Sequence, residues 1–240
     1  MLQKTNGIIL HSLKYSDSAN IVTIFTSEFG RVVYMVHGAN KKKSKCRNAF
    51  LQALTILDMD VYHSPNKTIQ SIKDIRIAFP LTGIPYHPIK NSLALFISEV
   101  LYRCIKQTDP DENMYYFLEN SIQALDCCEE GLANFHLVFL LKLTRYLGFE
   151  PNIEAEQFKY FDLMNGVVSV SKPIHNHYLT PESTDNFVLI MQADFTNLKT
   201  ISLHREERYK LLENIIEYYK LHLTDFYGLN SLPILHALFD

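Results

Sequence analysis

Glycine, tryptophan and catalytic motifs are scarce or absent in this sequence. The 240 residues include eight Gly and no Trp. The Gly-x-x-x-x-Gly-Lys-Ser/Thr, Gly-x-Ser-x-Gly and His-Glu-x-x-His patterns, which mark phosphate-binding loops, serine hydrolases and zinc peptidases, do not occur. So few glycines also leave little material for a loop that wraps a phosphate group. We therefore interpret the chain as a binding protein rather than an enzyme, and we expect no cofactor.

Cysteines and long apolar segments are scarce as well. The four cysteines, Cys46, Cys104, Cys127 and Cys128, form no Cys-x-x-Cys pair, which argues against a zinc ribbon or a thioredoxin-type site. No apolar run approaches the roughly 20 residues that cross a bilayer. The N-terminal residues, Met1 to Gly7, lack the apolar region of a signal peptide. We expect a cytoplasmic protein with reduced thiols.

His175 and His177 form a His-x-His pair of the kind found among metal ligands. A zinc site needs three or four ligands, and neither a cysteine nor a third histidine lies nearby in the sequence. We therefore interpret both histidines as surface side chains and predict no metal site.

Positive and negative charges are divided unevenly along the chain. Residues 1–80 carry eleven Lys and Arg against five Asp and Glu, a net charge of +6, whereas residues 81–240 carry twelve against twenty-one, a net charge of −9. Five of the cations lie between Lys41 and Arg47, here called the basic loop, which is too polar to be buried. This asymmetry indicates a polyanionic partner for the basic part. The alternative for the loop alone is a solvated connector that binds nothing.

The first third of the chain alternates apolar and polar residues with a period of two, as half-buried strands do. Five short strands, with the longest connection after the third, predict a small closed barrel. The OB-fold is a five-stranded barrel whose exposed face and loops bind oligonucleotides. The expected strands are Gly7–Tyr15, Asn20–Ser27, Arg31–His37, Leu51–Tyr62 and Thr68–Phe79.

From Pro88 onward the period becomes helical. The third expected helix is apolar almost all round, which is typical of the middle of a bundle. Before the fourth helix, Tyr160–Leu163 and Val167–Val170 form a short hairpin whose Asn-Gly pair favours a type I′ turn. The expected helices are Pro88–Lys106, Asp109–Cys127, Leu132–Tyr146, Asn186–Asp194, His204–Thr224 and Pro233–Phe239.

These patterns together predict an α+β protein. Residues 1–80 form the OB-fold domain, and residues 81–240 form an α-helical domain with an irregular insert at about 150–182. Single-stranded nucleic acid is held by basic grooves in which bases stack on aromatic rings. The candidate rings are Tyr15, Phe29, Tyr34 and Tyr62, and the candidate phosphate contacts are Lys14, Arg31, Lys41, Lys42, Lys43, Lys45 and Arg47. Alternation also allows any single ring to lie in the barrel core.

Several segments resemble the RecO family of bacterial recombination mediators. The run from Gly7 to Arg31, GIILHSLKYSDSANIVTIFTSEFGR, is similar to the family's opening, and so are the Val-His-Gly-Ala segment and the basic loop that follow it. Further matches are Leu147-Gly148-Phe149-Glu150-Pro151, Phe161-Asp162 and Asn165-Gly166. The resemblance covers the whole chain in outline and is most specific in the first 40 residues.

The resemblance implies an OB barrel followed by a helical domain. It also implies binding of single- and double-stranded DNA, annealing of complementary strands, and loading of the RecA recombinase on strands coated by single-stranded DNA-binding protein. The implied partners are RecR and the acidic C-terminal tail of that coating protein. By resemblance, phosphate contacts fall on Arg31 and the basic loop, and the tail would lie beside the third helix at Phe139, Lys142 and Arg145.

One departure from the family concerns zinc. Many relatives carry four cysteines after the Leu-Gly-Tyr/Phe-x-Pro stretch, whereas Asn152 to Pro181 contains none here. We therefore predict no zinc, and we expect the hairpin to be held by packing of Phe158, Tyr160 and Phe161.

Two alternatives to DNA binding remain open at this point. The first is an interaction scaffold whose barrel and helices bind proteins and whose lysines only provide solubility. The second is a hydrolase that uses scattered His and Asp side chains. Charge reversal of Lys41–Lys43 would leave partner binding intact in the first case, and activity on an ester or phosphoester panel would support the second.

Overall fold

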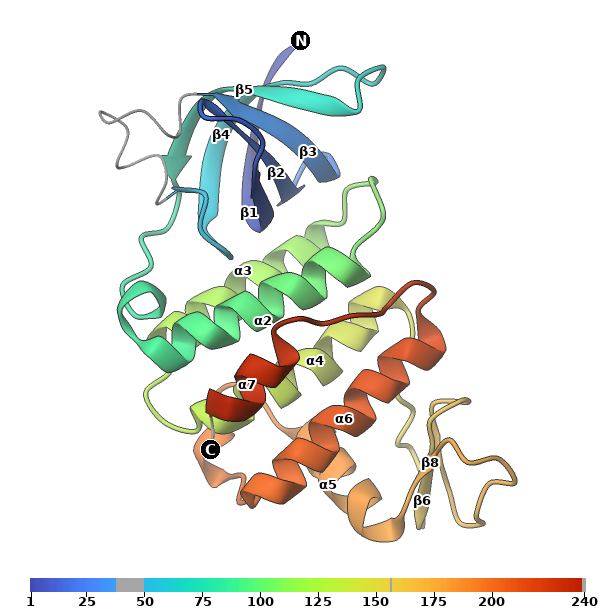
Figure 1. The fold of residues 1–240 in the computed structure, drawn as a ribbon. Helices are drawn as coiled ribbons and strands as arrows, with labels where there is room; N and C mark the ends of the chain where they lie inside the picture. Colours follow the sequence, from blue (N-terminus) through green and yellow to red (C-terminus); the bar gives the residue numbers. More distant parts are fainter. Residues whose placement is uncertain (38–49, 156, 239–240) are drawn as a thin grey trace. The chain divides into compact units, whose positions relative to one another are not determined.

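The computed structural model describes residues 1–37, 50–155 and 157–238 (Figure 1). The chain divides into two compact units, Met1–Asp126 and Cys127–Asp240. The first unit contains a five-stranded barrel and two helices, and the second contains further helices with a small three-stranded sheet. The predicted α+β organisation is confirmed. Residue 80, the predicted domain boundary, follows the last strand of the barrel, while the first two helices belong to the compact unit of the barrel.

The barrel closes in the order β1-β2-β3-β5-β4. All neighbouring strands are antiparallel except β3 and β5, which run parallel. This is the strand order of an OB-fold, so the predicted barrel is confirmed. The strands are β1 (Leu2–Lys14), β2 (Ala19–Thr26), β3 (Gly30–His37), β4 (Ile56–Tyr62) and β5 (Ile69–Ile77).

Two predicted strand starts are wrong. β1 begins at Leu2 because its polar first residues pair with the whole of β4, from Leu2 opposite Tyr62 to Ile8 opposite Ile56. β4 begins only at Ile56, since the chain before it turns at Leu54, whose φ is 60°. Leu51 and Leu54 are buried in this turn, so their apolar character reflects packing at the barrel rather than a strand.

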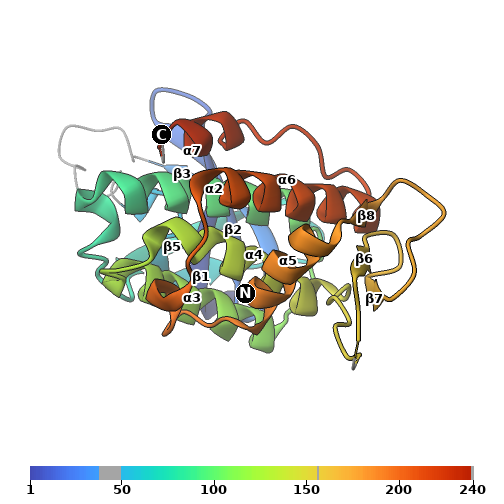
Figure 2. The same ribbon diagram turned by 90° about the horizontal axis from the view of Figure 1, so that it is seen from below.

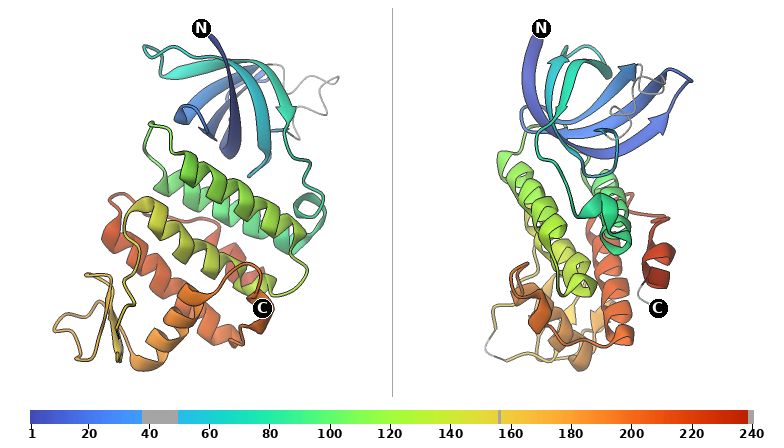
Figure 3. Two further views of the ribbon diagram at one scale, coloured as in Figure 1. Left: turned by 180° about the vertical axis from the view of Figure 1, so that it is seen from behind. Right: turned by 90° about the vertical axis from the view of Figure 1, so that its left-hand side faces the viewer.

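Helices α2 (Pro88–Cys104) and α3 (Glu112–Cys127) lie together on one side of the barrel (Figures 1 and 3). The loop between them approaches the start of β3 closely, because a Cβ on Gly30 would lie 2.4 Å from the carbonyl oxygen of Asp109. On the outer side of β2, Phe25 stacks on Tyr115 of α3 with ring centroids 6.4 Å apart. These contacts make the barrel and the helix pair one packed body.

A buried carboxylate fastens the segment that leads from the barrel to α2. Asp126, near the end of α3, accepts hydrogen bonds from the backbone N–H groups of Thr82 (2.9 Å), Gly83 (2.8 Å) and Ile84 (2.6 Å). The ammonium of Lys90 donates to the carbonyl oxygen of Asp126 at 2.6 Å. The 3₁₀ turn η1 (Ile84–Tyr86) starts within this cluster of hydrogen bonds. Four donors from two segments are thereby fixed at one residue of α3.

The second unit is built around α4 (Leu132–Leu147), whose residues 134–141 are all buried. The predicted apolar central helix is therefore confirmed. Helices α4, α5 and α6 pack on one another (Figure 2). The predicted fourth helix starts too late, because α5 begins at Pro181 rather than Asn186. The remaining elements are α5 (Pro181–Gln192), η2 (Leu198–Thr200), α6 (Arg205–His222) and α7 (Leu232–Leu238).

A three-stranded sheet stands beside α5 (Figure 2). Its strands β6 (Tyr160–Asp162) and β7 (Val167–Ser169) confirm the predicted hairpin, and the two-residue β8 (Tyr178–Leu179) was not predicted. The type I′ turn is wrong, because such a turn requires a positive φ at Asn165, and in the described residues only Leu54, Asp225 and glycines have one. The loop instead spans four residues and ends with Gly166 at φ 67°.

Asp162 organises this sheet. Its carboxylate accepts hydrogen bonds from the backbone N–H groups of Met164 (2.9 Å) and Asn165 (3.0 Å) and from the Asn165 side chain (2.7 Å), and it pairs with His175 Nε2 at 3.1 Å. Burial acts to raise the pKa of Asp162, and the hydrogen bonds from Asn165 and His175 outweigh it, so this pKa lies below its usual value. Phe161 adds the apolar anchor, with its ring 4.5 Å from that of Phe187.

Candidate nucleic-acid interface

The basic loop lies outside the described residues, and so do its predicted phosphate contacts Lys41, Lys42, Lys43, Lys45 and Arg47. The strand that leads into it is described. β3 ends at His37, which pairs with Ala19, and Val36 pairs with Asn20, the partner of Lys14. β3 therefore ends at the same end of the barrel at which Lys14 and the β1–β2 turn lie.

One outer face of the barrel carries both acidic and basic side chains. Cross-strand pairs place Lys4 opposite Asp60, Asp60 opposite Asp74, and Asp58 opposite Arg76 on strands β1, β4 and β5. The Arg76 guanidinium also contacts Asp74 at 3.1 Å. These pairs join three carboxylates and two cations, and Lys73 of β5 is also exposed, so the charged barrel face is nearly neutral and has little net attraction for a polyanion.

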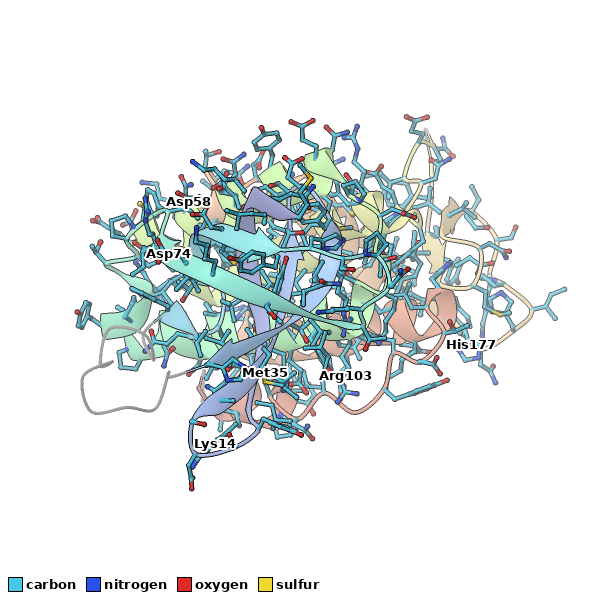
Figure 4. All side chains as sticks on the ribbon, turned by 90° about the horizontal axis from the view of Figure 1, so that it is seen from above. Lys14, Met35, Asp58, Asp74, Arg103 and His177 are labelled. Atoms are coloured by element: carbon cyan, nitrogen blue, oxygen red, sulfur yellow. The ribbon has the colours of Figure 1, made fainter. Side chains whose placement is uncertain are left out.

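The outer face formed by β1, β2, β3 and β5 is different. Its side chains alternate with the core residues Val32, Tyr34 and Val36, which point inward. Figure 4 places Lys14 and Met35 on this side and Asp58 and Asp74 on another. Leu13 and Ile69 are 56% and 39% exposed. We call this surface the apolar barrel face. The register aligns Leu13, Ile21 and Met35 in one row, and His11, the buried Thr23, Val33 and Ile69 in the next.

Lys14 lies at the end of β1, next to the apolar barrel face but in the row of Asn20 and Val36. Its ammonium contacts the Asp17 carboxylate at 3.1 Å, and both side chains are exposed. Such a surface pair contributes roughly 0–1 kcal/mol, so it leaves Lys14 accessible to a phosphate. The predicted role of Lys14 fits its place in the fold.

Arg31 has a structural role that its charge did not reveal. Its Nη1 donates to the carbonyl oxygens of Tyr102, at 2.8 Å, and of Ile105, and the guanidinium lies 4.6 Å from the centroid of the Tyr102 ring. Burial is the main cause that lowers its pKa. Carbonyl groups at the end of a helix lack partners within the helix, and a cation there is favourable. Arg31 thus fastens the end of α2 to β3, and a phosphate would have to share it.

The prediction that Tyr34 contacts DNA is wrong. Its side chain is fully buried among the barrel core residues, and burial raises its pKa above the usual range. Its hydroxyl has no hydrogen-bond partner. Among the other candidate rings, Tyr15 and Tyr62 are exposed, whereas Phe29 stacks on His63 with centroids 4.2 Å apart.

The burial of Tyr34 leads to a testable outcome. Tyr34→Phe is expected to leave DNA affinity unchanged and to keep or raise the free energy of unfolding by up to about 1 kcal/mol, because it removes a buried hydroxyl without a partner. Urea unfolding and an oligonucleotide titration measure both quantities. A drop in DNA affinity with unchanged stability would show instead that the Tyr34 hydroxyl takes part in DNA binding.

The predicted tail-binding residues do not form an open groove at Phe139, which is buried inside the second unit. That part of the prediction is wrong, because the side chain is enclosed by the helix's own packing. The two cations lie nearer the surface. Lys142 contacts Asp194 at 3.4 Å, and Arg145 contacts Glu150 at 4.0 Å.

His175 and His177 do not converge on a common point. His175 pairs with Asp162 at 3.1 Å, and His177 pairs with Glu217 at 2.7 Å. Across residues 1–37, 50–155 and 157–238, no group of three or more His, Cys, Asp or Glu side chains is arranged to hold a metal ion. Nor does any helix in those ranges combine the length and apolarity needed to cross a membrane.

Sequence reasoning missed a cluster at the side of the apolar barrel face. The exposed His11 of β1 stacks on Tyr102 of α2 with ring centroids 4.6 Å apart and planes 28° from parallel. Burial, followed by the positive charges of Arg31 and Arg103, lowers the pKa of His11. No sequence signal joins these residues, because they meet only when α2 packs on the barrel.

Comparison with known proteins agrees with this architecture. Residues 1–80 match the family described as "Recombination protein O N terminal", and residues 86–233 match "Recombination protein O C terminal". The chain is 38% identical to "DNA repair protein RecO" of Bacteroides fragilis (strain YCH46) and 36% identical to the protein of the same name of Phocaeicola vulgatus, in both cases over the full length of both chains. The corresponding protein of Flavobacterium psychrophilum is 36% identical over 99% of each chain. The chain therefore belongs to the RecO family of DNA repair proteins.

Proposed function

We propose that this chain is a DNA-binding recombination mediator of the cytoplasm, not an enzyme. It binds single- and double-stranded DNA, anneals complementary strands, and helps to load recombinase on strands coated by single-stranded DNA-binding protein. The observation that carries the proposal is the division of the barrel into a charged face, on which carboxylates and cations nearly balance, and an apolar face that ends beside Lys14 and His37. A nucleic-acid strand presents both phosphates and apolar base surfaces. The apolar barrel face can contact the bases, and the cations beside it can contact the phosphates.

The proposed mechanism needs no covalent chemistry. Cations of the barrel and the basic loop neutralise phosphates, which lowers the repulsion between two strands that approach each other. Aliphatic side chains such as Ile21, Val33 and Met35 contact the bases. Annealing then follows from holding strands at high local concentration with their charge reduced.

The proposed protein partners are RecR, the tail of single-stranded DNA-binding protein and, indirectly, RecA. An acidic tail that uses Lys142 and Arg145 has to replace the Asp194 and Glu150 carboxylates at these two cations. Both ion pairs are partly or largely exposed, so such an exchange costs little.

The test compares two charge reversals on opposite faces of the same barrel. Lys14→Glu is expected to weaken binding of a dT oligonucleotide several-fold and to make the log–log salt dependence shallower by about 0.7, the value for one phosphate contact with a single strand. Arg76→Glu changes the net charge equally but lies on the charged barrel face, so it is expected to have little effect. Fluorescence anisotropy between 50 and 300 mM salt measures both. Equal losses in the two variants would mean that net charge alone, and no particular face, attracts DNA.

A protein-interaction scaffold is the second candidate, and the aliphatic character of the apolar barrel face favours it, since Ile21, Val33 and Met35 offer no ring on which a base can stack. Under this alternative, wild-type protein shows no salt-dependent binding to oligonucleotides, while substitutions such as Met35→Glu abolish complex formation with a protein partner.

A further inference from the structure

Three side chains stack in series where β1, β3 and α2 meet. The Arg31 guanidinium lies 4.6 Å from the centroid of the Tyr102 ring, and the Tyr102 ring lies 4.6 Å from that of His11. Arg31 is half-buried, Tyr102 is partly buried and His11 is exposed. The series therefore runs from the packed junction outward and ends at an accessible imidazole.

The inner part of this stack is held firmly. Arg31 donates to two carbonyl groups at the end of α2, and its backbone N–H donates to the carbonyl oxygen of Gln107 at 3.3 Å. On the β1 side, the buried Ser98 hydroxyl of α2 donates to the carbonyl oxygen of Leu10, next to His11, at 2.6 Å. Both strands that carry the stack are thus tied to the same helix. A ligand that extends the stack finds it already ordered, so little side-chain entropy is lost on binding.

The surroundings of His11 are positive. Burial is the largest cause that lowers its pKa, and Arg31 and Arg103 add to it, whereas Glu99 opposes them. Arg103 and Glu99 are themselves only 3.9 Å apart. A lowered pKa favours the neutral imidazole, while the field of the neighbouring guanidinium groups favours an anion. Few ligands combine a negative charge with a flat ring, and a nucleotide is the common one.

The position of His11 links this site to the rest of the surface. His11 belongs to the row His11, Thr23 and Val33 on the apolar barrel face, adjacent to the row of Leu13, Ile21 and Met35. Figure 4 shows Arg103, Met35 and Lys14 on the same side of the barrel. A strand that starts at His11 can therefore pass over aliphatic side chains and reach Lys14 without crossing the charged barrel face.

We propose that His11 is a base-stacking platform for single-stranded nucleic acid, on which a base continues the series Arg31, Tyr102, His11, with its phosphate on the side of Arg103. This inference rests on the proposed DNA-binding function and adds to it the residue that receives a base. It supplies the ring that the aliphatic rows of the barrel do not provide. Duplex DNA, whose bases are already stacked, gains little from the platform.

The experiment measures binding of a single-stranded oligonucleotide that contains 2-aminopurine, and of a duplex of equal length, to full-length protein. His11→Ala is expected to weaken single-strand binding roughly 5- to 100-fold, the range for loss of one aromatic stacking partner. His11→Phe is expected to retain affinity and the quenching of 2-aminopurine that accompanies stacking. Because a stacked imidazole replaces no counterion at a phosphate, His11→Ala should leave the salt dependence unchanged, and duplex affinity should change less than single-strand affinity.

Tyr116→Ala serves as the matched control, since it removes an exposed ring of α3 in the same unit, whose neighbours are the carboxylates of Glu28, Glu112 and Glu119. Far-ultraviolet circular dichroism and thermal unfolding verify that each variant is folded. A shallower salt dependence in His11→Ala, or a larger loss in Tyr116→Ala, would overturn the platform. Unchanged DNA affinity in a folded His11→Ala variant would also overturn it, and would favour a protein partner for this surface. If wild-type protein binds no oligonucleotide, the proposed function itself fails, and the two failures are thereby distinguished.

Discussion

Replacing Lys41, Lys42 and Lys43 together with Glu is expected to weaken binding of single-stranded DNA by about a hundredfold or more at low salt, and to reduce the log–log salt dependence by about two. Each lysine that contacts a phosphate releases a counterion on binding, so each lost contact removes about 0.7 from the salt dependence of a single strand. The added carboxylates also repel the strand. The effect should be large because the basic loop supplies five of the eleven cations in residues 1–80.

The measurement is an anisotropy titration of a dT oligonucleotide at several salt concentrations, together with an annealing assay on complementary strands. The control is Lys199/Lys210/Lys220→Glu, which changes the net charge equally at three exposed positions of the second unit. If this control loses as much affinity as the loop variant, DNA responds to total charge. If neither variant loses affinity, the basic loop is only a solvated connector.

Asp126→Ala is expected to lower the free energy of unfolding of the first unit by about 4 kcal/mol, which is large beside the stability of a typical domain. The substitution leaves three backbone N–H groups without their acceptor, and each buried donor that loses its partner costs roughly 1–3 kcal/mol. Asp126→Asn should cost about half as much, since one oxygen still serves Gly83 and Ile84 while the new NH₂ group faces the N–H of Thr82.

Urea unfolding followed by circular dichroism gives the overall loss. Hydrogen exchange, read peptide by peptide, assigns the loss to residues 1–126, which matters because two compact units need not unfold together. The control is Asp185→Ala, which removes an exposed carboxylate of α5 and should change stability by less than about 0.5 kcal/mol. A loss of similar size in both variants would show that the hydrogen bonds at Asp126 contribute little to the free energy of unfolding.

Much of the fold could be predicted because local pattern and tertiary packing agree. Alternation of apolar and polar residues along β4 and the apolar surface of α4 reflect burial directly, and the OB barrel and central helix followed from such patterns. Prediction failed where pairing is decided at a distance. The polar first residues of β1 join the sheet only because β4 lies alongside them, and the two residues of β8 are too few to show any period.

The candidate site was harder to predict than the fold. Both faces of β3 are apolar, with Val33 and Met35 outside and Val32, Tyr34 and Val36 inside, so alternation cannot say which face is the core. Tyr34 was consequently placed on the wrong face.

Arg31 illustrates a second reason for these failures. Its charge indicated a phosphate contact, whereas its carbonyl partners become visible only when α2 is placed against β3. The His11 and Tyr102 pair joins β1 to α2, and no periodic pattern connects two such distant positions.

The parallel pairing of β3 and β5, here called the seam, determines where the barrel opens locally. Only Val33–Met35 and Ile69–Ser71 pair across it, whereas each antiparallel seam joins a longer stretch, and parallel pairing is slightly weaker per residue. Local opening therefore costs least free energy at this seam. The rows of the apolar barrel face cross the seam, from Val33 to Ile69. A ligand that spans both strands binds only the closed barrel, so by thermodynamic linkage its binding and the closure of the seam stabilise each other.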